Sequence, residues 1–430
     1  MRMSSMVVAG ALLAAAPLAA QEQAVLTLDR VYDALAAASP RLAAARAEVA
    51  AAEARIRPAG KWPDPQVQLG LMNRNLPGFG LQDPLGMNQI QVMQMIPTAG
   101  KTGLAVKAAR AEATARSAQS EETGWEVRSA GAMVFYDLYL ADATLAEMRR
   151  GRRLLEDAVR TASSMYAEGQ GPQAAALRGQ MELARMDEEL MRMGAMREGM
   201  AVRLNALLGR ASEAPVPTPA LPVFPDSLPP RDSLERLALA RRPMLAAGTA
   251  RVEAAHALSR KAGREIWPDL TVGVIYGQRP MNDGGTDRMA SLMLGFNLPI
   301  AAGGKQRQMA QEARAMEAAS AAELDDMRTE TRGRLGEAYA GLLRARRLGD
   351  LYRRTLLPQA EAVSVSALTG YRAGTLDFMA LLEAQMTLIR ARQELIRYEA
   401  ETGKAIAELE MLTASTLMDP TTTTHAGAAR

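Results

Sequence analysis

Four short segments of the chain alternate apolar and polar side chains with a period of two. This pattern is typical of β-strands that have one apolar and one polar face. The first two segments cover residues 65–72 and 88–96, and Gln94 falls on the apolar side of the second. The other two cover 270–277 and 291–298. We therefore predict four strands, arranged as two pairs far apart in the sequence.

Most of the remaining chain spaces its apolar residues alternately three and four positions apart, as coiled-coil helices do. One such seam consists of Leu183, Met186, Leu190, Met193, Arg197, Met200, Leu204 and Leu207. Residues 388–412 carry the same seam 205 positions later. Residues 101–167 contain no proline, so they predict a helix on the order of 100 Å long at about 1.5 Å per residue. A further helix is predicted over 28–59, with Thr27 as its N-cap.

The chain contains two copies of one structural unit. Trp62-Pro63-Asp64 returns 205 positions later as Trp267-Pro268-Asp269. Tyr166 returns as Tyr371 at the same offset. Collinear landmarks at a constant offset indicate an internal duplication, and copies of this length form a pseudo-symmetric pair rather than a solenoid.

The duplication and the two chain ends give the predicted domain organisation. Residues 1–20 have the basic start, short apolar run and small-residue cleavage site of a signal peptide. The first repeat covers 21–213, the second covers 231–418, and a Pro-rich linker over 214–230 joins them. The tail over 419–430 is predicted to be disordered.

Composition narrows the classes of function. The chain has no cysteine, so its stability must come from packing rather than disulfides. A net charge of +3, with both signs interspersed, argues against a nucleic-acid partner. No segment after the signal peptide has the length and apolarity of a transmembrane helix, so any membrane crossing must be made by strands.

We find no catalytic, cofactor or metal site in the sequence. The two histidines, His256 and His425, are far apart, and no cysteine accompanies them. The Gly303-Gly304-Lys305 run lacks the glycine spacing of a phosphate loop and is interpreted as a strand-to-helix turn. We therefore expect a protein that is not an enzyme and needs no cofactor.

The 27 methionines permit two interpretations. Thioether sulfur suits Cu(I) and Ag(I), but methionine is also a flexible filler of helical cores. Seam positions such as Met186 favour packing. Three methionines lie off the seam, at Met181, Met191 and Met196. Packing is the stronger interpretation, and a heavy-metal substrate stays open.

Four strands cannot close a transmembrane barrel alone, because single-chain barrels start at about eight. A chain that offers four amphipathic strands must share them with other copies, and three copies would supply twelve. Carried on helices of this length, such a barrel would form a continuous tube from a membrane into an aqueous compartment.

The chain resembles the TolC-like outer-membrane efflux family over nearly all of its mature length. The resemblance rests on the doubled helix–strand–loop–strand–helix–helix unit, on the strand exits at Pro97 and Pro299, and on the segment 371–385. It implies a mainly α fold with a small β part. The four strands of each chain would enter a twelve-stranded barrel shared by a homotrimer in the outer membrane, above a long periplasmic α-barrel.

The same resemblance implies partners and a cargo. The partners are a periplasmic adaptor protein, an inner-membrane pump, often of the RND type, and outer-membrane lipid. The sequence of the segment Gln94–Lys101 resembles that of heavy-metal members of the family, which favours Cu(I) or Ag(I) export.

In this family, the turns that join the two long helices of each repeat contact the adaptor and narrow the pore. The resemblance places these tips at Gly169, Gln170 and Gly171 in one copy and at Gly374, Thr375, Leu376 and Asp377 in the other. Of two acidic gate positions, Glu383 occupies one and Ala380 the other, so a single ring of Glu383 is implied. Such a ring would favour cations. An ordinary solvated carboxylate is the alternative interpretation of Glu383.

Two other functions remain open. A type I secretion duct for proteins belongs to the same class. A periplasmic coiled-coil scaffold belongs to a different one. A scaffold has no need of amphipathic strands at equivalent positions in both copies, which favours the duct.

Overall fold

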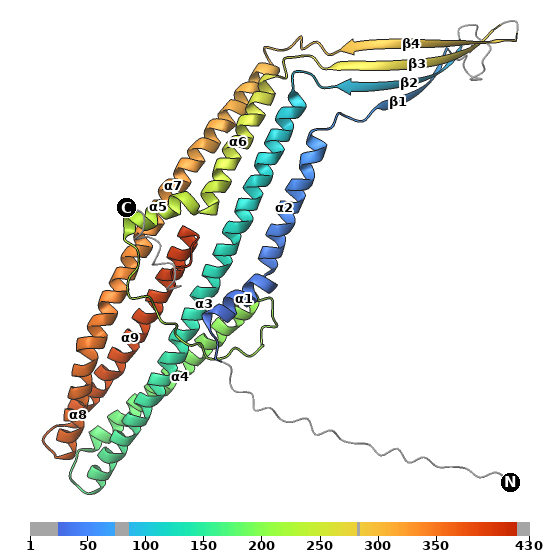
Figure 1. Cartoon of the computed structure of the whole chain (residues 1–430). Helices are drawn as coiled ribbons and strands as arrows, with labels where there is room; N and C mark the ends of the chain where they lie inside the picture. Colours follow the sequence, from blue (N-terminus) through green and yellow to red (C-terminus); the bar gives the residue numbers. More distant parts are fainter. Residues whose placement is uncertain (1–24, 74–85, 282–283, 419–430) are drawn as a thin grey trace, which may run out of the picture.

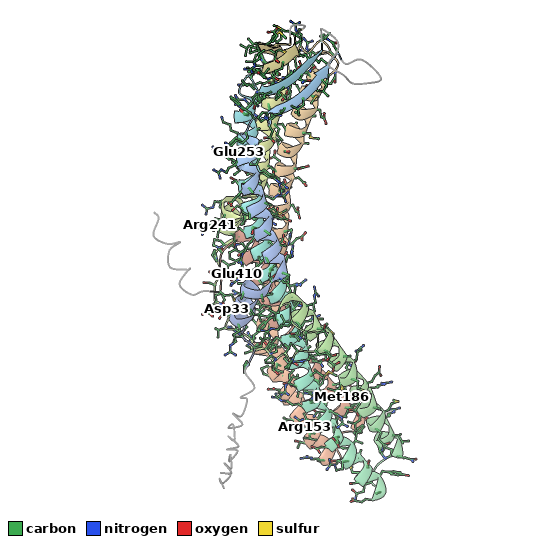
Figure 2. All side chains as sticks on the ribbon, turned by 90° about the vertical axis from the view of Figure 1, so that its right-hand side faces the viewer. Asp33, Arg153, Met186, Arg241, Glu253 and Glu410 are labelled. Atoms are coloured by element: carbon green, nitrogen blue, oxygen red, sulfur yellow. The ribbon has the colours of Figure 1, made fainter. Side chains whose placement is uncertain are left out.

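The computed structural model describes residues 25–73, 86–281 and 284–418, so the predicted signal peptide and tail lie outside the described residues. The chain forms an elongated body with a sheet at one end and two helical hairpins at the other (Figure 1). Figure 2 shows that this body bends near Glu410, with Met186 in the half below the bend. The predicted mainly α fold with a small β part is confirmed.

The sheet contains β1 (Gln66–Met72), β2 (Met87–Ile96), β3 (Leu270–Pro280) and β4 (Thr286–Phe296), antiparallel and in that order. All four predicted strands are confirmed. Three predicted strand ends were wrong by two or more residues, since β3 continues to Pro280 and β4 runs from Thr286 to Phe296 rather than over 291–298. Pro299 has no N–H to donate to a strand partner, so the chain leaves the sheet ahead of it.

The strand register gathers the apolar side chains on one face of the sheet. Val92 pairs with Val67 on one side and with Val274 on the other. Gln94 is the exception that the sequence pattern showed. Its Nε2 donates to the backbone oxygen of Pro63 at 2.7 Å and to that of Met95 at 2.8 Å. The amide thus holds the chain that leads into β1, at the base of the apolar face.

The helix predicted over 28–59 is two helices, α1 (Leu28–Ala38) and α2 (Pro40–Ala59). Ser39 between them is extended, with φ −67° and ψ 117°. Proline disfavours the helical conformation in the residue before it but suits the first turn of a new helix. The second repeat breaks in the same way at Arg242, between α5 (Arg231–Arg241) and α6 (Pro243–Gly263).

Each repeat has one long arm that runs from the sheet to the tip. In the first it is α3 (Lys101–Ala167), unbroken over 67 residues as predicted. In the second it is α7 (Gln306–Leu351) followed by α8 (Leu357–Arg372). The five residues between α7 and α8 form a π-helical turn.

Shorter helices flank the long arms. α2 and α6 pack on the sheet half of α3, whereas α4 (Gln173–Leu207) and α9 (Phe378–Thr413) pack on its tip half (Figure 1). The predicted seams face the partners, as the burial of Met186, Leu204 and Leu409 confirms. The off-seam Met191 is 70% exposed.

A buried ion pair joins the two repeats in the middle of the body. Arg242 donates Nε and Nη2 to Oε1 of Glu122 on α3, at 3.0 and 2.9 Å. Its Nη1 donates to Oγ1 of Thr331 on α7 at 2.8 Å. The Glu122 side chain is fully buried and that of Arg242 is nearly so. Removing either partner would leave an uncompensated charge in the core.

The two short coiled-coil helices end on buried polar residues at equivalent positions, Asn205 on α4 and Glu410 on α9. Asn205 Nδ2 donates to the backbone oxygen of Ala214 at 2.8 Å. Glu410 Oε1 accepts from the backbone nitrogen of Leu417 at 2.7 Å. Each therefore holds the segment that follows its helix. Burial raises the pKa of Glu410, against the opposing effect of these N–H groups and of Arg128.

Candidate functional site

The two tips share one backbone construction. Gly169 and Gly374 are left-handed, with φ of 73° and 70°. At the first tip, the N–H of Gly169 donates to the oxygen of Tyr166 at 3.0 Å, and Gln170 donates to Met165 at 2.8 Å. At the second, Gly374 donates to Tyr371 at 3.1 Å. This is the Schellman motif, which needs a residue that tolerates positive φ. The predicted reversals are therefore present in both copies.

Beyond the shared turn, the two tips differ in how the next helix begins. α4 follows Gly171 and Pro172, and no side chain caps it. α9 follows Leu376 and Asp377, and Asp377 Oδ1 accepts from the backbone nitrogen of Ala380 at 2.8 Å. Asp377 is thus an exposed N-cap, which satisfies one of the free N–H groups of the first turn.

An aromatic contact holds the two hairpins together just behind their tips. A Cβ added to Gly179 on α4 would lie 2.9 Å from Cζ of Phe378, so the ring occupies the space that glycine leaves. Phe378 also meets Tyr371 edge-on, with ring centroids 5.8 Å apart. Val159 and Leu381 belong to the same buried cluster. The tips therefore lie side by side as one unit (Figure 1).

Glu383 lies on α9, two turns behind Asp377, and its side chain is exposed. It lines an open groove of ≈ 620 Å³. One wall is α9, and the other is the π-helical turn together with the start of α8. The groove also contains Ala380, Thr387, Arg390 and Glu394 from α9. Arg178, the equivalent of Glu383 in the first repeat, is exposed as well. The structure therefore places opposite charges at equivalent positions on neighbouring hairpins.

Sequence reasoning missed a second polar site, at the joint between sheet and helices. Lys101 begins α3, and its side chain is only 6% exposed. Its Nζ lies 3.0 Å from Asp269 Oδ1 and 2.9 Å from the backbone oxygen of Trp267. Asp269 also accepts from the backbone nitrogen of Thr98 at 2.9 Å. The doubled Trp-Pro-Asp and Gly-Lys motifs were the signal for this site.

Within the three described stretches, no group of three or more His, Cys, Asp and Glu side chains is placed to hold a metal ion. His256 pairs with Glu317 on the neighbouring helix, Nδ1 to Oε1 at 2.6 Å. Among the same residues, none of the helices has the length and apolarity needed to cross a membrane.

Residues 31–210 and 234–415, most of both repeats, match the outer membrane efflux protein family. The chain belongs to the outer membrane efflux protein family. No curated protein sequence gives a significant match.

Solved structures of outer-membrane channels share the fold. The channel OprN has a TM-score of 0.78 and 18% identity over 91% of both chains. VceC from Vibrio cholerae has a TM-score of 0.77 and 17% identity over 91% of this chain and 96% of its own. CusC has 0.76 and 14% over 90% and 92%. At this level of identity the likeness concerns the fold alone.

Proposed function

We propose that this member of the efflux family is the exit duct of a tripartite efflux system. It conducts substrates passively from an inner-membrane pump and a periplasmic adaptor to the exterior. The observation that carries this proposal is the duplicated pair of long arms, which connects an amphipathic sheet at one end to two exposed turns at the other. The arms are long enough to cross much of a periplasm.

Three copies would close the sheet into a twelve-stranded barrel in the outer membrane. The apolar face supports this, because Leu69 and Leu294 expose 77% and 65% of their surface. Outer-membrane lipid is the solvent that would cover such side chains. The opposite face carries Gln68, Gln91 and Ser291, which suit a water-filled lumen.

The tips bind the adaptor, through which the duct meets a pump of the RND type. The turn residues support this role, because Gly171 is half-buried and the others are exposed, namely Gly169, Gln170, Gly374, Thr375 and Leu376. Asp377 would act there mainly as a helix cap. Glu383 forms an acidic ring at the narrow end of the pore, and its exposure on α9 is consistent with that role.

The cargo proposed for the duct is a soft monovalent cation, Cu(I) or Ag(I). The polar face of the sheet presents six methionines and no histidine among the described strand residues. Met93 and Met293 flank Gly273, where an added Cβ would lie 3.2 Å from Met93 Cγ and 3.6 Å from Met293 Cβ. The thioethers of these two methionines beside Gly273 would be weak ligands for Cu(I) or Ag(I) along the lumen. Weak sites suit conduction, because the ion must also leave them.

Deleting the gene and restoring it in variant form tests the proposal. Wild-type protein should fractionate with the outer membrane and restore tolerance to silver ions. Recovery only in the soluble periplasm would support the scaffold instead. Restored secretion of a protein, without any gain in tolerance, would support a type I secretion duct.

The cargo has its own test. Met93→Leu with Met293→Leu keeps the side-chain volume and removes both sulfurs. We expect lower silver tolerance at an unchanged level of outer-membrane protein. Met186→Leu, in the buried seam, is the matched control. Equal silver tolerance in both variants would reject the methionine-lined path and leave the duct intact.

A further inference from the structure

Among the described residues, the joint between sheet and helices is formed once, although its lysine and its Trp-Pro-Asp segment occur twice in the sequence. The complete joint brings Lys101 of the first repeat to Asp269 of the second, across a gap of 168 residues. Thr98 Oγ1 donates to the backbone oxygen of Pro268 at 2.5 Å, and Arg264 donates to that of Ala99. This joint ties the exit of β2 to the entry of β3.

The second lysine and the second aspartate do not meet each other in the described part of the chain. Lys305 follows β4, and Asp64 precedes β1, which are the two outer strands of the sheet. Both side chains are exposed, and none of the ion pairs among the described residues includes either one. A pair like that of Lys101 and Asp269 would therefore need a second copy, whose β1 lies against β4.

We propose that Lys305 of each subunit forms an ion pair with Asp64 of the partner subunit, which closes the ring where barrel and helices meet. This inference rests on the proposed trimer and names the contact that completes it. In the assembled ring, all six joints between sheet and helices would then carry a Lys–Asp pair. Three of these pairs lie within a chain, and three lie between chains.

The internal register also fixes how β4 meets the partner's β1. Within the chain, Val92 of β2 pairs with Val274 of β3. The duplication shifts β2 by 202 positions, from Pro97 to Pro299, and shifts β3 back by 205, from Trp267 to Trp62. Val92 therefore becomes Leu294, and Val274 becomes Leu69 of the partner subunit.

The two faces of the sheet agree with this register. Leu294 and Leu69 already lie on the same face of the sheet, through the pairs that link Leu294 to Val272 and Leu69 to Ile90. The new pair therefore continues the apolar face around the ring. A slip by one residue would turn the apolar side chains of the partner's β1 toward the lumen.

A disulfide tests the register, because the native chain has no cysteine to interfere. Leu294→Cys combined with Leu69→Cys should give a covalent trimer on a denaturing gel after mild oxidation. Phe296→Cys with Leu71→Cys is the control, since the register keeps these residues four positions apart. Cross-linking of the control pair alone would overturn the register.

A charge exchange tests the ion pair. Lys305→Glu should reduce the fraction of detergent-resistant trimer about tenfold, because it places two like charges in a closed joint. Adding Asp64→Lys should restore the trimer. If the wild-type chain forms trimers and the double variant does not, the ion pair is overturned but the duct is not. A wild-type chain that never trimerises would overturn the proposed function itself.

Discussion

The two ends of the molecule use the duplication in opposite ways. At the sheet end, both copies keep the same charged pair, with Lys101 and Lys305 after the second strand of each pair and Asp64 and Asp269 before the first. At the tips, the copies have diverged, so that Glu383 stands on one hairpin where Arg178 stands on the other. In the proposed ring, equivalent residues at the sheet end would let every joint form the same contact. At the tips, the proposed adaptor binding and gating could use residues that differ between the copies.

The largest effect is expected from the contact that unites the two tips. Phe378→Ala empties the space beside Gly179 and should lower the free energy of unfolding by about 4 kcal/mol. Met379→Ala is the matched control. The Met379 side chain is exposed, so its removal should change the free energy of unfolding little. Thermal unfolding measures both. Equal melting temperatures would mean that the hairpins are held by other contacts.

The two lysines give the sharpest comparison between equivalent positions. Lys101→Ala removes the cation from a built joint and should cost about 2–3 kcal/mol in the dissociated monomer. Lys305→Ala should leave the monomer unchanged and weaken only the trimer. Unfolding in a detergent that separates the subunits distinguishes the two effects. A loss of monomer stability in Lys305→Ala would contradict the open joint.

A smaller effect is expected at the start of the two tip helices. Asp377→Ala removes the N-cap of α9 and should cost about 1 kcal/mol. Pro172→Asp places a cap before α4, where none is present, and should add up to about that amount. Hydrogen exchange of the first turn of each helix measures both changes. Identical exchange in wild type and Asp377→Ala would show that the cap adds no stability.

The smallest effect on stability, and the largest on conduction, is expected at Glu383. Glu383→Ala should lower the preference for cations in single-channel recordings, because it removes the proposed acidic ring. Arg178→Ala should keep that preference or increase it. Unchanged selectivity in Glu383→Ala would remove this residue from the gate.

Most elements could be predicted because their periodicity is set by neighbours in the sequence. The long helix over 101–167 matched α3 at both ends, since glycine precedes it and a left-handed glycine follows its last turn. The break at Ser39 was missed although Pro40 signalled it. Proline suits the first turn of a helix, so Pro40 marks the start of α2 rather than the interior of a longer helix.

The joint at Lys101 could not be predicted in the same way. Lys101 and Asp269 lie 168 residues apart in the sequence, and the strand order brings them together. The doubled motifs marked both positions without showing that one copy pairs inside the chain and the other does not. The roles of Glu383 and the tip residues stay predictions, because they concern partners and motion rather than the fold.

The π-helical turn at Tyr352–Leu356 accounts for a difference in length between the two arms. From Lys101 to Tyr166 the first arm has 65 steps, and from Lys305 to Tyr371 the second has 66. Before the turn, buried residues of the arms correspond at an offset of 204, as Leu138 does to Leu342. After it the offset is 205, as Val159 to Ser364 shows.

One extra residue in an α-helix would rotate everything beyond it by about 100°. Ala367 and Tyr371 would then leave the buried face, and the second hairpin would point away from the first. The π-helical turn accommodates the extra residue, as π-bulges do. Pro358 follows this turn, and in an uninterrupted α-helix a proline would remove a backbone hydrogen bond. The extra residue of the second arm therefore affects only the π-helical turn, and the tips of both arms keep equivalent buried faces.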